Sequence, residues 1–356
     1  MRAAILLEPY NLRLMDIPKP KPHRDEVLLE VKACGICGSD VRYFMGENPW
    51  ALHTIGINEP MPPNTVLGHE VCGTVVEGEE STYIHKGDYV GVIAFRSCGE
   101  CEVCRKGLHN LCAEQLHIGH DGRWKDREYI PGGFADFMPV WRDKVRKLSN
   151  SISPPEATQL DGLAVAVYAV RRAHISQGDS VAIIGSSAIG LLLLQVAKAY
   201  GADFVFSSDI LEKPLDVASS LGADMTINAR RENLASVVER ETGGRGVDVV
   251  FDTVGSRETF KTGLKILKRA GRMVLLAVTD TEVSINLRDL SGERIITSSA
   301  NNLYPEYDIG IRLMATGKVR AKPFITHIFN LNDIVEAFDI ALHKEDYGAI
   351  KVVITP

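Results

Sequence analysis

The residues Val181-Ala182-Ile183-Ile184-Gly185-Ser186-Ser187-Ala188-Ile189-Gly190 decide the fold of this chain of 356 residues. The four apolar residues at 181–184 predict a buried strand. The turn that follows them opens directly into Leu191-Leu192-Leu193-Leu194, and a helix is predicted over 190–200. A strand, a tight turn and a helix in this order begin a βαβ unit.

The sequence on the C-terminal side of this stretch continues to alternate between the two kinds of element. Pro214 suits the first turn of a helix that runs to Leu221. Further strands are predicted at 204–208, 225–228, 247–252 and 272–277, and further helices at 234–242 and 258–267. Because apolar strands that alternate with helices form parallel sheets covered on both faces, this half of the chain is predicted to be an α/β, doubly wound domain.

The turn at 185–190 also has the spacing of a dinucleotide-binding fingerprint, with Ser187 in place of the middle glycine. Asp209 ends the next predicted strand about twenty residues on, where a carboxylate accepts hydrogen bonds from a ribose and disfavours the extra phosphate of NADP. We therefore expect NAD as the cofactor. The alternative is a glycine-rich turn with a helix-capping aspartate. The residues predicted to bind the cofactor are Gly185, Ser187, Ile189, Gly190, Asp209, Ala277 and Val278.

The N-terminal part of the chain has a different texture. Residues 1–150 hold short β-like runs at 26–33, 74–77 and 89–94, separated by turn signals. The texture changes after Pro154-Pro155, and 356 residues exceed the usual size of one hydrophobic core. We expect two domains, the first of them mostly β.

Four cysteines in the first half, Cys98, Cys101, Cys104 and Cys112, lie within fifteen residues. Four thiolates at such spacing fill the tetrahedral shell of a structural zinc ion and leave no open position. Redox-active thiols or coincidence are the alternatives, although a redox pair needs only two cysteines.

Composition excludes some classes of partner. The formal net charge is −6 and the pI is near 6.0, whereas nucleic-acid binding normally demands a basic patch. The apolar run 163–170 is far shorter than a membrane span, and the N-terminal run is too short for a signal peptide. We expect a cytoplasmic protein that binds neither nucleic acid nor membrane.

Two further segments, Cys34-Gly35-Ile36-Cys37-Gly38-Ser39-Asp40 and Gly68-His69-Glu70, stand ahead of the four cysteines. In this order the chain resembles the zinc-containing medium-chain alcohol dehydrogenases, and most of all their sorbitol and threonine dehydrogenase branch. The resemblance covers essentially the whole chain. It implies a GroES-like, mostly-β catalytic domain at 1–155 that carries the structural-zinc lobe, a Rossmann domain at 156–298, and a return of 299–356 to the first domain. It also implies a homodimer or homotetramer.

The resemblance further implies a catalytic zinc, and thus two zinc ions per chain. Cys37 and His69 match zinc ligands, and Glu70 matches a carboxylate beside the metal. Asp161 falls where the polyol branch has a glutamate ligand, so oxygen ligation stays plausible with a shorter side chain. A buried cysteine as a small hydrophobe, a polar His–Glu pair and a helix-capping aspartate are the simpler readings of the same residues.

The expected reaction is hydride transfer between NAD and a secondary alcohol of a polyol, cyclitol, aminocyclitol or sugar-like substrate. Ser39 matches the hydroxyl that begins the family's proton relay, but Arg42 stands where many relatives continue it with histidine. Arginine cannot act as a base near neutral pH. Either water carries the proton onward in place of residue 42, or Arg42 contacts the phosphates of the cofactor. Asn302 stands where the polyol dehydrogenases that this chain resembles carry an arginine that contacts the substrate. The aromatic rings of Trp50, His53 and Trp124 either line the substrate pocket or pack against other parts of the chain. A 3-hydroxy amino acid dehydrogenase and a non-catalytic NAD-binding relative with the structural zinc alone are the alternatives.

Overall fold

The computed structural model describes residues 1–59, 61–79, 82–121, 123–124 and 127–356, without the side chains of residues 53–55. The chain forms two compact units. The first contains Met1–Asp161, Leu303–Ile311 and Ile325–Pro356, and the second contains Gly162–Asn302 and Arg312–Phe324. The first division therefore falls after Asp161 rather than after residue 155, and part of the predicted return segment, Arg312–Phe324, belongs to the second unit.

The first unit is built mainly from β-strands. Its strands are β1 (Arg2–Glu8), β2 (Asn11–Asp16), β3 (Glu26–Ile36), β4 (Thr65–Val66), β5 (Glu70–Gly78), β6 (Tyr89–Val92), β7 (Phe95–Arg96), β8 (Leu116–His117), β9 (Phe137–Trp141), β10 (Val145–Lys147), β17 (Ile325–Asn330) and β18 (Lys351–Thr355). Seven of them form one sheet in the order β10-β6-β5-β3-β18-β17, with β9 also paired to β3. The other two sheets are β2-β1-β4 and β7-β8.

Strand β3 organises this unit because it lies in the middle of the large sheet. One edge of β3 pairs antiparallel with β5 from Val27 to Gly35. Its other edge pairs with β9 near its start and with β18 near its end. Strand β18 comes from the end of the chain, so the sheet brings Lys351 and its neighbours beside the Cys34–Ile36 segment.

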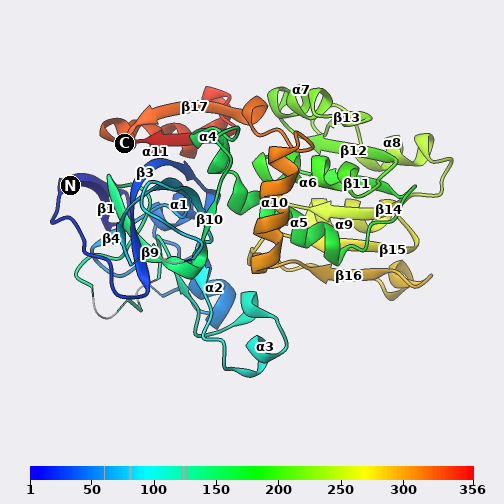
Figure 1. Ribbon diagram of the computed structural model, residues 1–356. Coiled ribbons are helices and arrows are strands. Elements are labelled where there is room, and N and C mark those ends of the chain that lie inside the picture. The colour runs from blue at the N-terminus through cyan, green and yellow to red at the C-terminus, as the bar shows by residue number, and fades with distance from the viewer. Residues whose placement is uncertain (60, 80–81, 122, 125–126) are drawn as a thin grey trace. The chain divides into compact units, whose positions relative to one another are not determined.

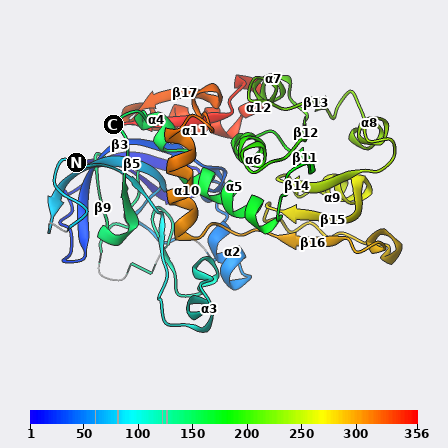
Figure 2. The same cartoon turned by 45° about the vertical axis from the view of Figure 1, so that its right-hand side comes forward.

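The helices that lie wholly in the first unit are short, with four to nine residues each. They are α1 (Gly38–Phe44), α2 (Pro49–Ile55), α3 (Glu102–Arg105), α4 (Pro154–Ala157), α11 (Ile334–Leu342) and α12 (Lys344–Tyr347). The segment that carries α3 projects from the rest of this unit in both views (Figures 1 and 2). The core packs apolar side chains of the large sheet against Phe338 and other residues of α11.

The second unit contains a single parallel sheet. Its strands are β11 (Ser180–Ile184), β12 (Phe204–Asp209), β13 (Met225–Asn228), β14 (Val247–Asp252), β15 (Leu267–Leu275) and β16 (Ile295–Ser298). Figure 1 shows them following one another in the order β13-β12-β11-β14-β15-β16, and every neighbouring pair is parallel. This order reverses direction between β11 and β14, as in doubly wound folds that bind nucleotides. The predicted fold class is confirmed.

The helices of this sheet are α6 (Ala188–Ala199), α7 (Glu212–Ser220), α8 (Leu234–Glu241) and α9 (Arg257–Ile266). Helix α6 begins directly after the turn at 185–187, and Leu191–Leu194 are buried, as expected for an apolar run that leads a crossover helix back along the sheet. Helices α5 (Leu160–Arg172) and α10 (Tyr304–Ala315) each begin in the first unit and end in the second. Within the described residues, no helix is long and apolar enough to span a bilayer.

Candidate metal centres and active site

The four cysteines predicted to bind zinc come together in the lobe that follows β7. Cys98 follows β7, Cys101 precedes the short helix α3, Cys104 lies on α3, and Cys112 follows a single 3-10 turn at His109–Leu111. Gly99 has a φ of +79°, so the tight turn between the first two cysteines uses the left-handed conformation that glycine adopts without strain. We call residues 97–112 the four-cysteine lobe.

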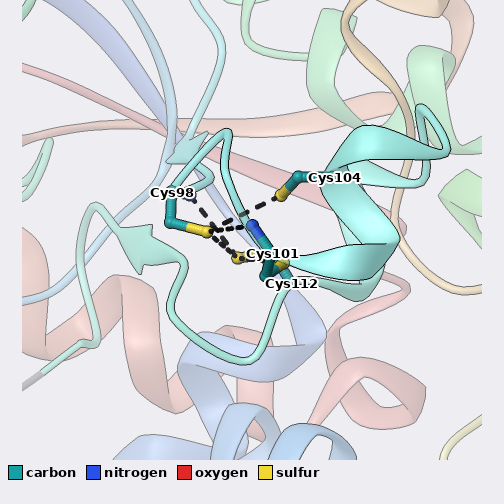
Figure 3. A group of neighbouring side chains, drawn as sticks. All are labelled: Cys98, Cys101, Cys104 and Cys112. Carbon is teal, nitrogen blue, oxygen red and sulfur yellow. Dashed lines mark hydrogen bonds between the residues drawn. The ribbon is translucent and has the colours of Figure 1, made fainter.

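The four sulfur atoms have the spacing of a tetrahedral metal shell. Figure 3 shows the four side chains pointing toward one another, and their Sγ atoms all lie within 4.8 Å of one another. The distance from Cys98 Sγ is 3.9 Å to Cys104 Sγ and 3.5 Å to Cys112 Sγ. Tetrahedral zinc with Zn–S bonds of about 2.3 Å requires sulfur atoms about 3.8 Å apart. The donor set and its spacing both fit a structural zinc ion.

The charges that the four cysteine thiols can carry also favour a bound cation in this lobe. Backbone N–H groups of Glu100 and Cys101 lower the pKa of the Cys98 thiol to about 6. Burial raises the pKa of the Cys112 thiol to about 12, and the neighbouring sulfurs of Cys98 and Cys104 add to that rise. Four thiolates so close together repel one another, and a bound divalent ion removes that repulsion.

A second group of metal-ligand atoms comes from Cys37, His69 and Glu70. Cys37 lies between β3 and α1, while His69 and Glu70 lie at the start of β5, which pairs with β3. One sulfur, one nitrogen and one carboxylate oxygen from these residues lie within 4.8 Å of one another. His69 is 5% exposed and Glu70 4% exposed, so both side chains are withdrawn from bulk water. Sulfur, nitrogen and oxygen donors in this number are the set that open zinc sites use.

Asp40 holds the backbone around this group. It is fully buried, and its carboxylate accepts hydrogen bonds from the backbone N–H of Cys37 at 2.8 Å and of Gly68 at 3.2 Å. His69 Nδ1 lies 3.5 Å from Asp40 Oδ1. Burial lowers the pKa of His69, but the nearby Asp40 carboxylate and Cys37 sulfur outweigh burial and raise that pKa well above its usual value. The electrostatic potential at the site is thus negative, which favours a bound cation.

Glu70 has a buried cationic partner that the sequence pattern did not reveal. Lys351 Nζ on β18 forms an ion pair with Glu70 Oε2. Burial would lower the pKa of Lys351, but the charges of Glu70 and Cys37 raise it overall. A Cβ atom at Gly35 would come within 2.2 Å of Glu70 Oε2 and 2.9 Å of Lys351 Cε, so glycine at this position leaves room for the pair.

Asp161 lies outside the group formed by Cys37, His69 and Glu70. It occupies the first turn of α5, in the first unit. Burial raises the pKa of Asp161 to about 6, and the charge of Glu70 adds to this while the charge of His69 opposes it. Asp161 therefore interacts electrostatically with the group, and its ligation of zinc stays a prediction.

The other residues predicted around the active site have varied surroundings. Ser39 is half-buried on α1, and Arg42 on the same helix donates from Nε to Glu47 Oε2 at 2.6 Å. Trp124 stacks on Trp141 and donates its Nε1–H to the backbone carbonyl of His117, so its side chain packs against other residues of the first unit. The guanidinium of Arg123 lies over the ring of Trp50, with its Cζ atom 4.5 Å from the ring centroid.

Two more of these residues complete the set. Asn302 is fully buried and donates its backbone N–H and its Nδ2–H to Asn301 Oδ1. The side chain of His53 lies outside the described residues.

The cofactor fingerprint adopts the expected strand–turn–helix geometry in the second unit. Gly185 has a φ of +98°, and a Cβ atom at Gly190 would come within 1.9 Å of the carbonyl oxygen of Gly185, so the turn requires both glycines. Ser187 is exposed at the N-cap of α6 with a φ of −64°, which any residue adopts. Asp209, at the end of β12, accepts backbone hydrogen bonds from Ser186 at 2.7 Å and Leu211 at 3.0 Å.

Three other residues were predicted to bind the cofactor. Ile189 is half-buried in the first turn of α6. Ala277 and Val278 follow the end of β15, and Val278 is 41% exposed. All three therefore lie beyond the carboxyl ends of parallel strands, which is where nucleotides bind in doubly wound sheets.

Fold and metal-ligand groups together define a two-unit, zinc-binding dehydrogenase. Comparisons with known proteins agree. Residues 23–150 match the model of the alcohol dehydrogenase GroES-like domain, and residues 188–316 match that of the zinc-binding dehydrogenases. The chain belongs to the zinc-containing alcohol dehydrogenase family of the medium-chain superfamily.

Individual relatives cover nearly the whole chain. The chain is 34% identical over 336 residues to an L-threonine 3-dehydrogenase of Pyrococcus abyssi, with 93% of this chain and 92% of the relative covered. It is 27% identical over 358 residues to a sorbitol dehydrogenase of Bacillus subtilis, with 100% and 97% covered. A structure from Sinorhizobium meliloti 1021, described as a zinc-binding dehydrogenase bound to NADP, matches with a TM-score of 0.88 and 29% identity, covering 100% of this chain and 99% of that one.

Sequence reasoning missed Asp40, Lys351 and two buried histidines, His117 and His120. Asp40 had a signal, because an acidic residue three positions after Cys37 has the spacing of a capping box, which the structure contains. Lys351 had a weaker one, since a lysine at the start of the otherwise apolar run of β18 requires a partner if it is buried. The two histidines had none, because their positions depend on packing between distant segments.

Proposed function

We propose that this protein oxidises a secondary alcohol of a small polyhydroxylated substrate, such as a polyol, cyclitol or aminocyclitol, with NAD as the hydride acceptor. The observation that carries the proposal is the convergence of Cys37, His69 and Glu70 on one buried point. These residues would hold a catalytic zinc ion in addition to the structural one. When bound, zinc acts as a Lewis acid that lowers the pKa of a substrate hydroxyl and so favours loss of hydride from the adjacent carbon.

The chain's own residues supply positioning and charge around that point. Asp40 fixes the backbone of the two segments that carry the ligands, through Cys37 and Gly68. Lys351 balances the charge of Glu70. Because this carboxylate is already paired, the site does not hold an uncompensated buried Glu70 charge when no metal is bound.

Proton transfer and the third protein ligand complete the proposal. Ser39, two residues after Cys37, is the hydroxyl that would accept the proton of the substrate alcohol while releasing its own proton to solvent water. Arg42 holds Glu47 and therefore acts through its charge rather than as a base. Asp161 is the candidate for the remaining carboxylate ligand, directly or through water; its pKa near 6 leaves it mostly ionised at neutral pH, as a metal ligand must be.

The preference for NAD over NADP rests on Asp209. A carboxylate at the end of the second strand accepts hydrogen bonds from ribose hydroxyls and repels a 2′-phosphate. A related structure holds NADP, so this choice belongs to the individual chain rather than to the family. We further propose a cytoplasmic homodimer or homotetramer that binds neither nucleic acid nor membrane, consistent with the net charge of −6.

The test combines metal analysis with a substrate panel. We expect two zinc ions per chain, and NADH formation with at least one member of a panel of sugar alcohols, cyclitols and aminocyclitols. In Cys37→Ser we expect one zinc ion and loss of activity. The matched control is Cys72→Ser, since Cys72 is a cysteine of the same unit, on β5, that lies outside both metal groups. One zinc ion in the unmodified chain, together with no activity on any secondary alcohol, would instead support a non-catalytic relative.

A second candidate is oxidation of a 3-hydroxy amino acid. It is favoured by the 34% identity to the threonine dehydrogenase of Pyrococcus abyssi. Including L-threonine and L-serine in the panel separates the two candidates. A kcat/KM for L-threonine above that of every polyol would replace the first proposal by the second.

A further inference from the structure

Six rings of the first unit follow one another with nearly parallel planes. In order they are Tyr43, His120, His117, Phe95, Tyr304 and His109, and we call them the ring column. Neighbouring ring centroids are 4.8, 3.8, 6.4, 5.1 and 5.1 Å apart, and the planes of neighbours differ by 18–28°. Tyr43 is 1% exposed, Phe95 is fully buried, and His117 and His120 are 7% and 5% exposed, so this part of the column packs inside the unit. The column joins α1, the segment 117–120, β7, the start of α10 and the four-cysteine lobe.

His69 meets the middle of this column edge-on. Its ring centroid lies 5.5 Å from that of His117 and 5.4 Å from that of His120, at interplanar angles of 78° and 89°. These are the edge-to-face geometries that aromatic rings prefer. The contact of His69 Nδ1 with Asp40 Oδ1 is long, 3.5 Å, and His69 Nδ1 has no hydrogen-bond partner among the residues that the structure describes. The orientation of His69 therefore depends largely on the two imidazole faces it packs against.

The far end of the column is fixed to the four-cysteine lobe by hydrogen bonds. Tyr304 Oη accepts from the backbone N–H of Ser97 at 3.0 Å and lies 3.0 Å from Ser97 Oγ. Ser97 Oγ is also 3.0 Å from His109 Nδ1. Ser97 precedes Cys98, and His109 lies between Cys104 and Cys112, so a metal ion that orders the lobe also orders both partners of Tyr304. Lys144 Nζ lies 3.9 Å from the Tyr304 ring centroid and adds a cation–π contact.

We propose that His117 and His120 are positioning residues for His69, and that Tyr304, through Phe95, ties them to the four-cysteine lobe. The proposal rests on the proposed role of His69 as a metal ligand. It means that the structural lobe does more than hold its own fold: filling it with metal orients a ligand of the other metal site. Because coupling of two binding sites is reciprocal, each bound ion raises the affinity of the other site.

Cobalt(II) binding to the full-length apoprotein tests this, since cobalt reports each site by its own visible absorption. The variants are Tyr304→Leu, which removes a ring, and Tyr304→Phe, which keeps it. In Tyr304→Leu we expect the affinity of the Cys37–His69–Glu70 site for cobalt to fall about tenfold, the loss typical of residues that orient a metal ligand, and its absorption band to shift. Tyr304→Phe keeps the stacked ring but loses the hydroxyl that bonds to Ser97, so it should keep the band position while weakening the dependence of this site's affinity on metal at the four cysteines. The matched control is Tyr83→Leu, because Tyr83 is 79% exposed and outside the column.

A second pair of variants keeps the test decisive if Tyr304→Leu does not fold. His120→Phe preserves the stack between Tyr43 and His117, and His120→Ala removes it. We expect a wild-type cobalt band in the first and a shifted band with weaker binding in the second. Identical bands and affinities in the ring-keeping and ring-removing variants would overturn the inference while leaving the proposed function intact. If the unmodified chain binds cobalt only at the four thiols, the proposed function fails, and the role of the column with it.

Discussion

The Nζ atom of Lys351 and the carboxylate of Glu70 form an ion pair inside the first unit, where the two side chains are 6% and 5% exposed. The residues are 281 positions apart in sequence, and they meet because β18 pairs with β3, which pairs with β5. Gly35, on the strand between them, leaves the space that the pair occupies. The last strand of the chain thus completes the electrostatics of a site formed by its first quarter.

Removing Lys351 should leave an uncompensated charge in the interior. We expect Lys351→Met to lower the free energy of unfolding of the metal-free protein by about 3–5 kcal/mol, the usual effect of breaking a buried ion pair from one side. Added zinc should recover part of this loss, because the metal supplies another positive charge beside Glu70. Urea unfolding with and without zinc measures both effects. The double variant Glu70→Gln/Lys351→Met should be more stable than Lys351→Met alone; equal stability would show that the unpaired carboxylate of Glu70 does not cause the loss.

The four-cysteine lobe should lose its metal when one thiol is replaced. Cys112 is fully buried, and its sulfur lies 3.5 Å from Cys98 Sγ, so Cys112→Ser removes a central donor. We expect one zinc ion fewer per chain by mass spectrometry of metals and a lower Tm by calorimetry, because binding energy at structural zinc sites is folding energy. Cys72→Ser should keep its zinc content. Unchanged zinc in Cys112→Ser would argue against a four-thiolate site.

The charge of Asp209 should set the choice of cofactor. Asp209→Asn removes the negative charge and keeps an oxygen for one of the two backbone N–H groups, those of Ser186 and Leu211, that donate to separate oxygens of Asp209. We expect the ratio of kcat/KM for NAD to that for NADP to fall at least about tenfold, since the repulsion of a 2′-phosphate is lost. The control is Asp179→Asn in the same unit, because Asp179 pairs with Arg272 away from the fingerprint. A ratio that moves equally in both variants would remove the assignment.

Asp136 should make stability depend on pH in the acid range. Burial alone would raise its pKa, but hydrogen bonds from the side chain and the backbone N–H of Arg2 lower it below 3.8. A carboxylate with a lowered folded-state pKa contributes stability that is complete above the unfolded pKa and is lost as the pH falls through the folded value. We expect Asp136→Asn to lower the free energy of unfolding by about 1.5 kcal/mol at pH 7, as for a hydrogen bond to a charged group, and this loss to shrink as the pH falls through the lowered pKa of Asp136. Urea unfolding of the variant and wild type across this range measures it, and a loss that is constant with pH would contradict it.

The sequence predicted the second unit closely. Strands β13 and β14 have the predicted bounds. Both ends of α6, α8 and α9 lie within two residues of the predicted ends. Strand β16, helix α10 and strand β17 were not predicted. Strand β16 is an edge strand with half-exposed residues, so it lacks the continuous apolar run that marks β11 and β14.

The two groups of metal ligands also differ in how far the sequence alone predicts them. The spacing of Cys98, Cys101, Cys104 and Cys112 predicts a metal shell because ligands so close in sequence can reach only one ion. The group of Cys37, His69 and Glu70 could be inferred only by resemblance, since its members lie on separate segments. Its buried surroundings (Asp40, Lys351, His117 and His120) come from strand pairing and ring packing.

By itself, the sequence determined what is local: the alternation of strands and helices, the glycines that the cofactor turn requires, and four thiols on one short segment. Tertiary structure alone decided which distant side chains meet, bringing Lys351 to Glu70 and Tyr304 to Ser97 and His109. The physical reason is that backbone periodicity and turn chemistry act over a few residues. Buried charges and stacked rings, by contrast, gain their energy from partners that only the folded sheet order brings within contact distance.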